Sequence, residues 1–179
     1  LRFSDPFHAV QWWATNTPEQ EAVVFPGARK RITYAELLHQ SSALAAGLRS
    51  LGVRAGDAVA IWAENRAEWI VSQLAICAVG AVMVPVNTHF REQDVAYVLE
   101  HSNAVAILLS QRFRKNAYLD MVQSQRGALP ALKHVVCFDP DGSKAHHGVV
   151  DYAALLSAPI ADLRPTPSEG RALPSVQHT

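Results

Sequence analysis

Short, nearly continuous apolar runs alternate along the chain with segments of helical periodicity. Apolar residues occupy almost every position of four runs, Ala58–Ala63, Ala81–Val86, Ala104–Leu109 and His134–Phe138. Strands of this kind are buried on both faces. The intervening segments predict helices over about Ala67–Val79, Glu92–His101 and Ala117–Gln125. Because strands that alternate with helices form parallel sheets, we predict an α/β fold: a three-layer, open, mostly parallel sheet with helices on both faces.

The clearest unit is the stretch from Gly56 to Asn87. It contains a turn, a strand, a helix that ends at Gly80 and a second strand. This order is that of a β-α-β unit, in which two parallel strands are joined by a crossover helix. Ligands of such sheets usually bind at the carboxyl ends of the strands, so chemistry is expected there.

The N-terminal region predicts a helix followed by a small hairpin. Asp5 is a capping residue, and Pro6 suits the first helical position. Two short β-rich runs follow, Ala22–Phe25 and Lys30–Thr33, joined by the turn sequence Pro26-Gly27-Ala28. Turn residues between two such runs predict a β-hairpin at the N-terminal end of the domain.

A capping box begins the next helix. Thr33 and Glu36 have the spacing at which a hydroxyl and a carboxylate each accept from the other's backbone N–H. Apolar residues then recur at helical spacing, and Gly52 ends the helix.

Composition indicates one ordinary soluble domain. The chain has 179 residues, of which 49% are hydrophobic and 18% charged, so a sizeable core forms without a metal or a disulfide. Sixteen basic and sixteen acidic residues balance, which argues against nucleic acid as a partner. Cys77 and Cys137 lie in apolar runs and are interpreted as reduced core residues. Without a signal pattern or a membrane-length apolar run, we expect a cytoplasmic protein.

The C-terminal end differs in character from the rest. We assign residues 1–158 to one α/β subdomain and residues 159–179 to a proline-rich extended tail. A short helix is expected at Asp151–Ala158. His146-His147, near Asp139, belongs to a surface loop, and we predict no metal site there.

Two polar segments follow predicted strands at the edge where ligands usually bind. They are Asn87-Thr88-His89-Phe90 and Arg112-Phe113-Arg114-Lys115. The cations could contact an anionic group such as a phosphate; a solvated basic turn is the alternative reading. The glycines form no G-x-G fingerprint, no phosphate loop of the G-x-x-x-x-G-K-[ST] type and no nucleophile elbow.

Three motifs together resemble the AMP-forming adenylating superfamily, which contains acyl-CoA synthetases, peptide-synthetase adenylation domains and luciferases. Ile32–Leu37 is similar to its L-T-Y-x-E-L motif. Gly56–Ile61, with Asn65 and Trp69, is similar to its G-D-x-V-A-I-x-x-x-N-x-x-E-W segment. Ala78–Asn87 is similar to its helix–glycine–strand motif ending in V-P-x-[ND]. The segment after Asn87 is most like that of free-standing fatty-acid–CoA ligases.

The resemblance implies a ligase that works in two steps. A carboxylate and ATP, with Mg²⁺, give an acyl-adenylate and pyrophosphate, and coenzyme A (CoA) then displaces AMP. The family's phosphate loop begins at a position similar to Thr179, so the resemblance assigns this chain the amino-terminal part of the enzyme. It therefore implies no catalytic residue here and an inactive fragment with no bound cofactor. Thr88, His89, Arg114 and Lys115 are candidates for the CoA side of the site.

Two other functions stay open at this stage. One is a ligase of an aryl or other small carboxylate, and the other is a non-catalytic, stand-alone α/β binding or scaffold domain. A fatty acid or other carboxylate is the expected substrate of the complete enzyme. We also expect exposed apolar surface through which two copies could form a dimer. Peripheral membrane contact suits a ligase of fatty acids, although no basic amphipathic helix supports it.

Overall fold

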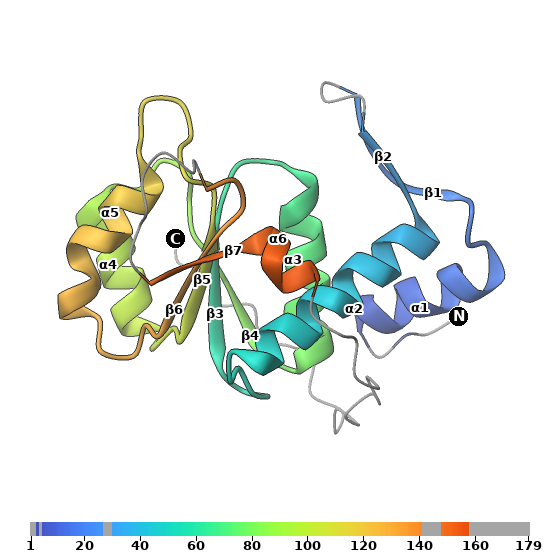
Figure 1. Ribbon diagram of the computed structural model, residues 1–179, viewed down its shortest axis with the longest axis horizontal. Helices are drawn as coiled ribbons and strands as arrows, with labels where there is room; N and C mark the ends of the chain where they lie inside the picture. Colours follow the sequence, from blue (N-terminus) through green and yellow to red (C-terminus); the bar gives the residue numbers. More distant parts are fainter. Residues whose placement is uncertain (1–2, 4, 27–29, 141–147, 158–179) are drawn as a thin grey trace.

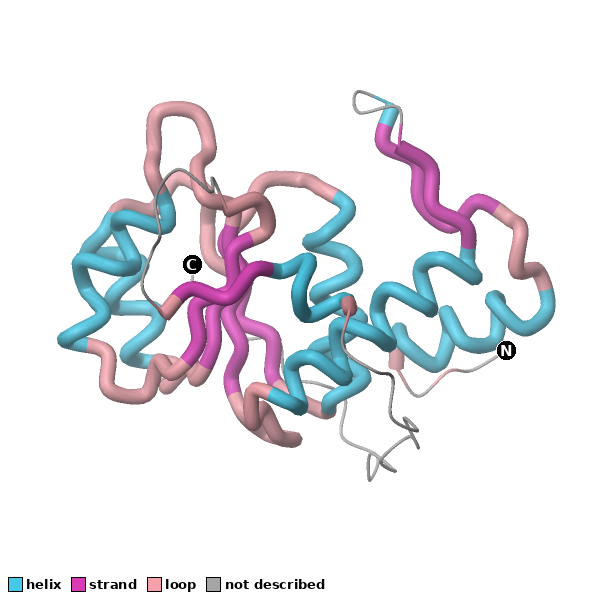
Figure 2. Tube along the Cα trace, in the orientation of Figure 1, coloured by secondary structure: helices cyan, strands magenta, loops and turns pink. Residues whose placement is uncertain are grey.

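The chain forms a three-layer α/β fold, as predicted. The computed structural model describes residues 3, 5–26, 30–140 and 148–157. Its main sheet has five parallel strands in the order β4-β3-β5-β6-β7. They are β3 (Ala58–Trp62), β4 (Val82–Pro85), β5 (Ala106–Leu109), β6 (His134–Cys137) and β7 (Val149–Asp151). Figure 2 shows these strands side by side between two groups of helices.

Helices cover both faces of the sheet. They are α1 (Pro6–Asn16), α2 (Tyr34–Ser50), α3 (Ala67–Val79), α4 (Glu92–His101), α5 (Tyr118–Gln125) and α6 (Tyr152–Leu156), with a short 3₁₀ helix, η2, at Arg126–Ala128. Figure 1 places α4 and α5 on one face and α2, α3 and α6 on the other.

Alternate residues of each central strand belong to different cores. Val59 and Ile61 of β3 face the core beneath α2 and α3. Ala60 and Trp62 of the same strand face the core beneath α4 and α5. All four side chains are fully buried. This burial on both faces is the physical reason for the continuous apolar runs.

The fifth strand corrects the prediction of four strands. β7 pairs in parallel with β6, from Val135↔Val149 to Cys137↔Asp151. With only three residues at the sheet edge, β7 is too short for a periodic signal. Its last residue, Asp151, caps α6 by accepting from the Ala153 N–H at 2.8 Å. The short helix expected at 151–158 is present as α6 over Tyr152–Leu156, and residue 158 lies outside the described residues.

The N-terminal hairpin forms a separate two-stranded sheet. β1 (Glu21–Phe25) pairs antiparallel with β2 (Lys30–Thr33), and the pair projects away from the main sheet (Figure 1). Residues 27–29, which include two residues of the predicted turn, lie outside the described residues, as do residues 141–147 and 158–179. The capping box at Thr33 and Glu36 is present, and Asp5 caps α1. Within the described ranges, no helix is long and apolar enough to cross a membrane.

Replacing Gly80 with alanine is expected to destabilise the protein by about 1–2 kcal/mol, because Gly80 ends α3 in the left-handed region. Its φ is +81°, and an added Cβ would lie 3.2 Å from the Cβ of Ala55. Gly127→Ala is the matched control, since an added Cβ there meets nothing within 4 Å. Urea denaturation of both variants measures the difference, and equal stabilities would contradict the expectation.

Candidate functional site

The carboxyl edge of the main sheet brings four loops together. The chain leaves β3, β4, β5 and β6 at this edge, because these strands are parallel and in register. All four residues that sequence reasoning proposed lie there. Thr88 and His89 follow β4, while Arg114 and Lys115 follow β5.

The loops after β4 and β5 are fastened to each other. The hydroxyl of Tyr118 donates to the carbonyl of Thr88 at 2.7 Å, and Arg91 donates to the side chain of Asn116. Tyr118 also stacks on Trp62, with ring centroids 3.8 Å apart. The structure therefore holds the two predicted segments side by side through partly buried contacts that the sequence did not reveal.

The loop after β4 is ordered by the side chain of Asn87. The side-chain Oδ1 of Asn87 accepts from the backbone N–H of His89 at 2.9 Å. The backbone carbonyl of Asn87 accepts from the indole N–H of Trp62 at 3.1 Å. His89 is exposed and Thr88 is half-buried. A ligand at this edge can thus reach the His89 ring, whereas the Thr88 carbonyl is already engaged.

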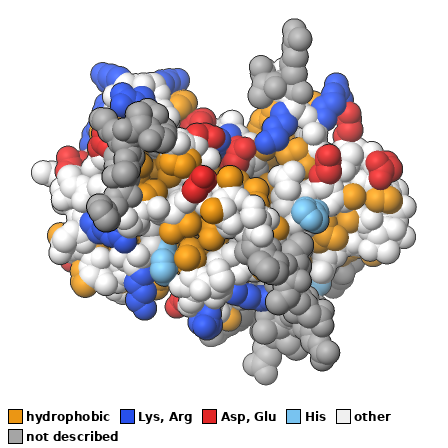
Figure 3. Space-filling model, viewed as in Figure 1, with side chains coloured by type: hydrophobic (Ala, Val, Ile, Leu, Met, Phe, Trp, Pro, Cys, Tyr) orange, Lys and Arg blue, Asp and Glu red, His pale blue; other side chains and the backbone are white. Residues whose placement is uncertain are grey.

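The loop after β5 exposes three cations. Arg112, Arg114 and Lys115 are all exposed, and blue side chains gather over this loop in Figure 3. Arg114 adopts a left-handed conformation, with φ 53°. Its guanidinium lies over the Phe113 ring, 5.3 Å from the ring centroid. We name residues 112–115 the cationic loop; none of its cations forms an ion pair with a described residue.

Burial keeps the hydroxyl of Tyr118, which lies beneath these loops, in its protonated form. Loss of solvent raises the pKa of Tyr118, and the negative charge of Glu64 adds to that rise, while Arg91 and Arg114 oppose it. The hydroxyl therefore stays protonated and donates to Thr88. Tyr118 acts as a structural link at this edge.

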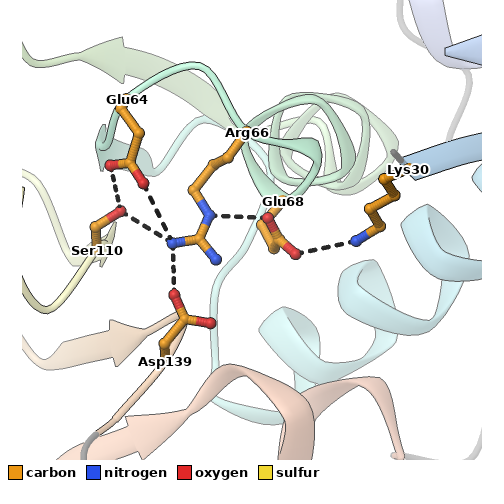
Figure 4. Close-up of polar contacts among 6 residues, drawn as sticks. All are labelled: Lys30, Glu64, Arg66, Glu68, Ser110 and Asp139. Carbon is orange, nitrogen blue, oxygen red and sulfur yellow. Dashed lines mark hydrogen bonds and ion pairs between the residues drawn. The ribbon is translucent and has the colours of Figure 1, made fainter. Parts of the chain in front are cut away.

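A second polar cluster, which sequence reasoning missed, centres on Arg66 (Figure 4). Arg66 precedes α3 and donates through Nε to Glu68 at 2.8 Å. Its Nη1 lies 2.6 Å from Asp139, which follows β6. The same nitrogen lies 3.6 Å from Glu64 and donates to Ser110 at 3.2 Å. We name these five residues the Arg66 network.

The Arg66 network fastens the ends of three strands. Glu64 follows β3, Ser110 follows β5 and Asp139 follows β6. The guanidinium also lies over the ring of Phe138, 5.0 Å from its centroid. Only the short spacing of Glu64, Arg66 and Glu68 was visible in the sequence, because the other two partners come from distant strands.

The carboxylates of the Arg66 network stabilise the charged form of Arg66. Burial disfavours the charged guanidinium, but hydrogen bonds to Asp139 and Glu68 outweigh it and raise the pKa of Arg66. Burial likewise favours the neutral form of Glu68, yet the hydrogen bond from Arg66 makes the pKa of Glu68 lower than usual. Three carboxylates surround one guanidinium, so the network does not suit an anionic ligand.

The described residues include neither a cysteine with a lowered pKa nor a cluster that could bind a metal ion. Burial raises the pKa of Cys77 to about 11 and also raises that of Cys137, so both stay thiols, as expected for core cysteines. Both are free, in agreement with the sequence prediction. In the part of the chain that the structure describes, no group of three His, Cys, Asp or Glu side chains could hold a metal ion.

The fold and the site define an α/β protein of the kind that binds ligands at the carboxyl edge of a parallel sheet. The sequence model of the AMP-binding enzyme family matches residues 10–170, so the chain belongs to this family. This confirms the resemblance seen in the three motifs.

Acyl-CoA ligases are among the proteins that this chain resembles. It is 39% identical over 107 residues to YngI of Bacillus subtilis, which is named as an acyl-CoA synthetase; the match covers 60% of this chain and 20% of YngI. It is 36% identical over 140 residues to FadD15 of Mycobacterium tuberculosis, a long-chain-fatty-acid–CoA ligase, covering 75% of this chain and 23% of FadD15.

A solved structure has a similar fold. A Rhodopseudomonas palustris protein described as a long-chain-fatty-acid CoA ligase superposes with a TM-score of 0.72 and 26% identity, covering 83% of this chain and 35% of that one. The matches to YngI and FadD15 show that the chain spans about a fifth of the length of these curated relatives.

Proposed function

We propose that this chain is the amino-terminal part of an ATP-dependent fatty-acyl-CoA synthetase. The observation that carries the proposal is the family match over residues 10–170, together with relatives named as acyl-CoA ligases. The reaction would join a fatty acid to AMP at the expense of ATP and then transfer the acyl group to CoA. Mg²⁺ would accompany the ATP, and no described residue is assigned to it.

The cationic loop suits the phosphates of CoA better than the Arg66 network does. Arg114 and Lys115 are exposed and form no ion pair with a described residue, whereas the Arg66 guanidinium is already held by carboxylates. We therefore propose Arg114 and Lys115 as phosphate-binding residues and Thr88 and His89 as their neighbours on the CoA side. Such residues orient CoA and leave the chemistry to other parts of the enzyme.

The first experiment measures the activity itself in the longest protein that the gene encodes. Pyrophosphate release that depends on a fatty acid, followed by acyl-CoA formation, is the expected result. Benzoate is the comparison substrate, because an aryl carboxylate ligase would prefer it. Absence of activity with every carboxylate would contradict the proposal and favour a non-catalytic binding domain.

Changing both Arg114 and Lys115 to alanine is expected to raise the KM for CoA about three- to tenfold, because each exposed cation contributes modestly to phosphate binding. The KM for ATP should stay unchanged, since the first half-reaction does not involve CoA. Steady-state kinetics at low salt measures both constants.

Lys133→Ala is the matched control for the single Lys115→Ala variant, which is measured beside the double variant. Lys133 is also exposed but precedes β6, at the opposite edge of the sheet. Its removal changes the net charge equally and should leave the KM for CoA as it is. An unchanged KM in the Arg114 and Lys115 double variant would reject these residues as CoA ligands.

A further inference from the structure

Two cations of the cationic loop, Arg114 and Lys115, form the tip of a tight turn. The backbone N–H of Phe113 donates to the carbonyl of Asn116 at 2.9 Å, and the N–H of Asn116 donates to the carbonyl of Phe113 at 3.0 Å. Glycine, asparagine or aspartate usually supplies the positive φ that such two-residue turns need, yet here Arg114 has a φ of 53°. A side chain other than glycine is strained in this conformation, so the surrounding structure must hold it there.

Aromatic rings support the first of these cations. The guanidinium of Arg114 lies over the Phe113 ring, and the face of an aromatic ring attracts a cation. The Phe113 ring lies beside that of Tyr118, with centroids 6.3 Å apart, and Tyr118 stacks on the fully buried Trp62. Three rings therefore connect Arg114 to the core beneath α4 and α5.

Two hydrogen bonds fasten the base of the turn to the loop after β4. Asn116 is only 9% exposed, and its side-chain Oδ1 accepts from Arg91, which precedes α4. The hydroxyl of Tyr118 donates to the carbonyl of Thr88 in the same loop. Because Asn116 and Tyr118 are buried, they influence a ligand at this edge through their exposed neighbours.

We propose that Phe113, Asn116 and Tyr118 are positioning residues, which hold Arg114 and Lys115 in the conformation that binds the phosphates of CoA. This inference rests on the CoA contact proposed above and names the residues that make the contact effective. Exposed cations on long side chains gain little from pairing, because ordering them costs conformational entropy. A turn that is already fixed in its bound conformation avoids part of that cost.

Calorimetric titration of CoA into the longest protein that the gene encodes tests this inference. Asn116→Ala is expected to weaken the affinity for CoA about two- to fivefold, because the turn must then be ordered on binding. Tyr118→Phe should have a similar effect. This second variant keeps the aromatic stack and removes only the hydrogen bond to the loop after β4.

The same substitutions are then made in the Arg114→Ala and Lys115→Ala double variant. Neither Asn116→Ala nor Tyr118→Phe should weaken CoA binding further there, since substitutions that act through the same contact are not additive. A role in stability alone would instead lower the affinity by the same factor in both backgrounds.

Ser124→Ala is the matched control for the loss of a hydrogen bond between these parts of the chain. Ser124 of α5 donates to Glu92 of α4 and lies outside the cationic loop. Its removal should leave the affinity for CoA unchanged.

The outcomes separate the positioning role from the proposed function. Unchanged affinity in Asn116→Ala and Tyr118→Phe, or an equal loss in both backgrounds, would overturn the positioning role alone. If the Arg114 and Lys115 double variant binds CoA as tightly as the unmodified protein, the CoA contact is rejected and the positioning role with it. Because the titration needs no catalysis, non-additive losses support the inference even if no acyl-CoA forms.

Discussion

Replacing Trp62 with alanine is expected to lower the free energy of unfolding by about 3–5 kcal/mol. Trp62 is fully buried at the end of β3, and it stacks on Tyr118 while donating to the carbonyl of Asn87. The substitution leaves a cavity and an unpaired carbonyl beneath the loops after β4 and β5. This loss is a large part of the roughly 5–15 kcal/mol that stabilises a typical domain.

Trp12→Ala is the comparison for this variant, because Trp12 of α1 is only half-buried. It should cost about 1 kcal/mol, as a partly exposed side chain does. Urea denaturation measures both variants, and amide hydrogen exchange shows whether the loop after β4 opens more readily in Trp62→Ala. Equal losses of unfolding free energy in the two variants would mean that the Trp62–Tyr118 stack does not stabilise the carboxyl edge of the sheet.

Replacing Arg66 with methionine is expected to cost about 2–4 kcal/mol at neutral pH, because removal of one partner leaves half-buried carboxylates uncompensated. The side chains of Glu64 and Glu68 are 29% and 21% exposed, while that of Asp139 is 67% exposed. Most of the cost should therefore come from the two glutamates. The methionine keeps an apolar side chain near the ring of Phe138, so the loss reports mainly on charge.

Acid should reduce the difference between this variant and the unmodified protein. The folded state lowers the pKa of Glu68 below its usual value of about 4.3. The stabilisation from its charged form is complete above the unfolded pKa and is lost as the pH falls through the lower, folded pKa. Chemical denaturation between neutral pH and about pH 3 follows this change.

Arg31→Met provides the matched control for Arg66→Met. Arg31 pairs with Glu21 on the hairpin, where the two side chains are 64% and 46% exposed. Exposed pairs contribute about 0–1 kcal/mol, so this variant should lose little stability at any pH. If Arg66→Met costs no more than Arg31→Met, the Arg66 network does not fasten the strand ends.

Features that depend on neighbouring residues could be predicted from the sequence. The capping box at Thr33 and Glu36 and the end of α3 at Gly80 are set by contacts within a few positions. The strands β3 to β6 were visible because each is apolar at successive positions. β7 was missed because its three residues become a strand only by pairing with β6.

The candidate site was predicted only in part. Position after a parallel strand was enough to place Thr88, His89, Arg114 and Lys115 at one edge of the sheet. It could not show that Tyr118 and Arg91 fasten the two loops to each other. Their role in binding CoA stays a prediction.

The sequence by itself therefore determined the family, the α/β class and the order of the central elements, because local patterns and motifs encode them. Tertiary structure alone decided which side chains meet. Arg66 contacts Ser110 and Asp139 only because β3, β5 and β6 end at the same edge of the sheet. In the same way, Arg91 contacts Asn116 only because β4 and β5 also end at that edge.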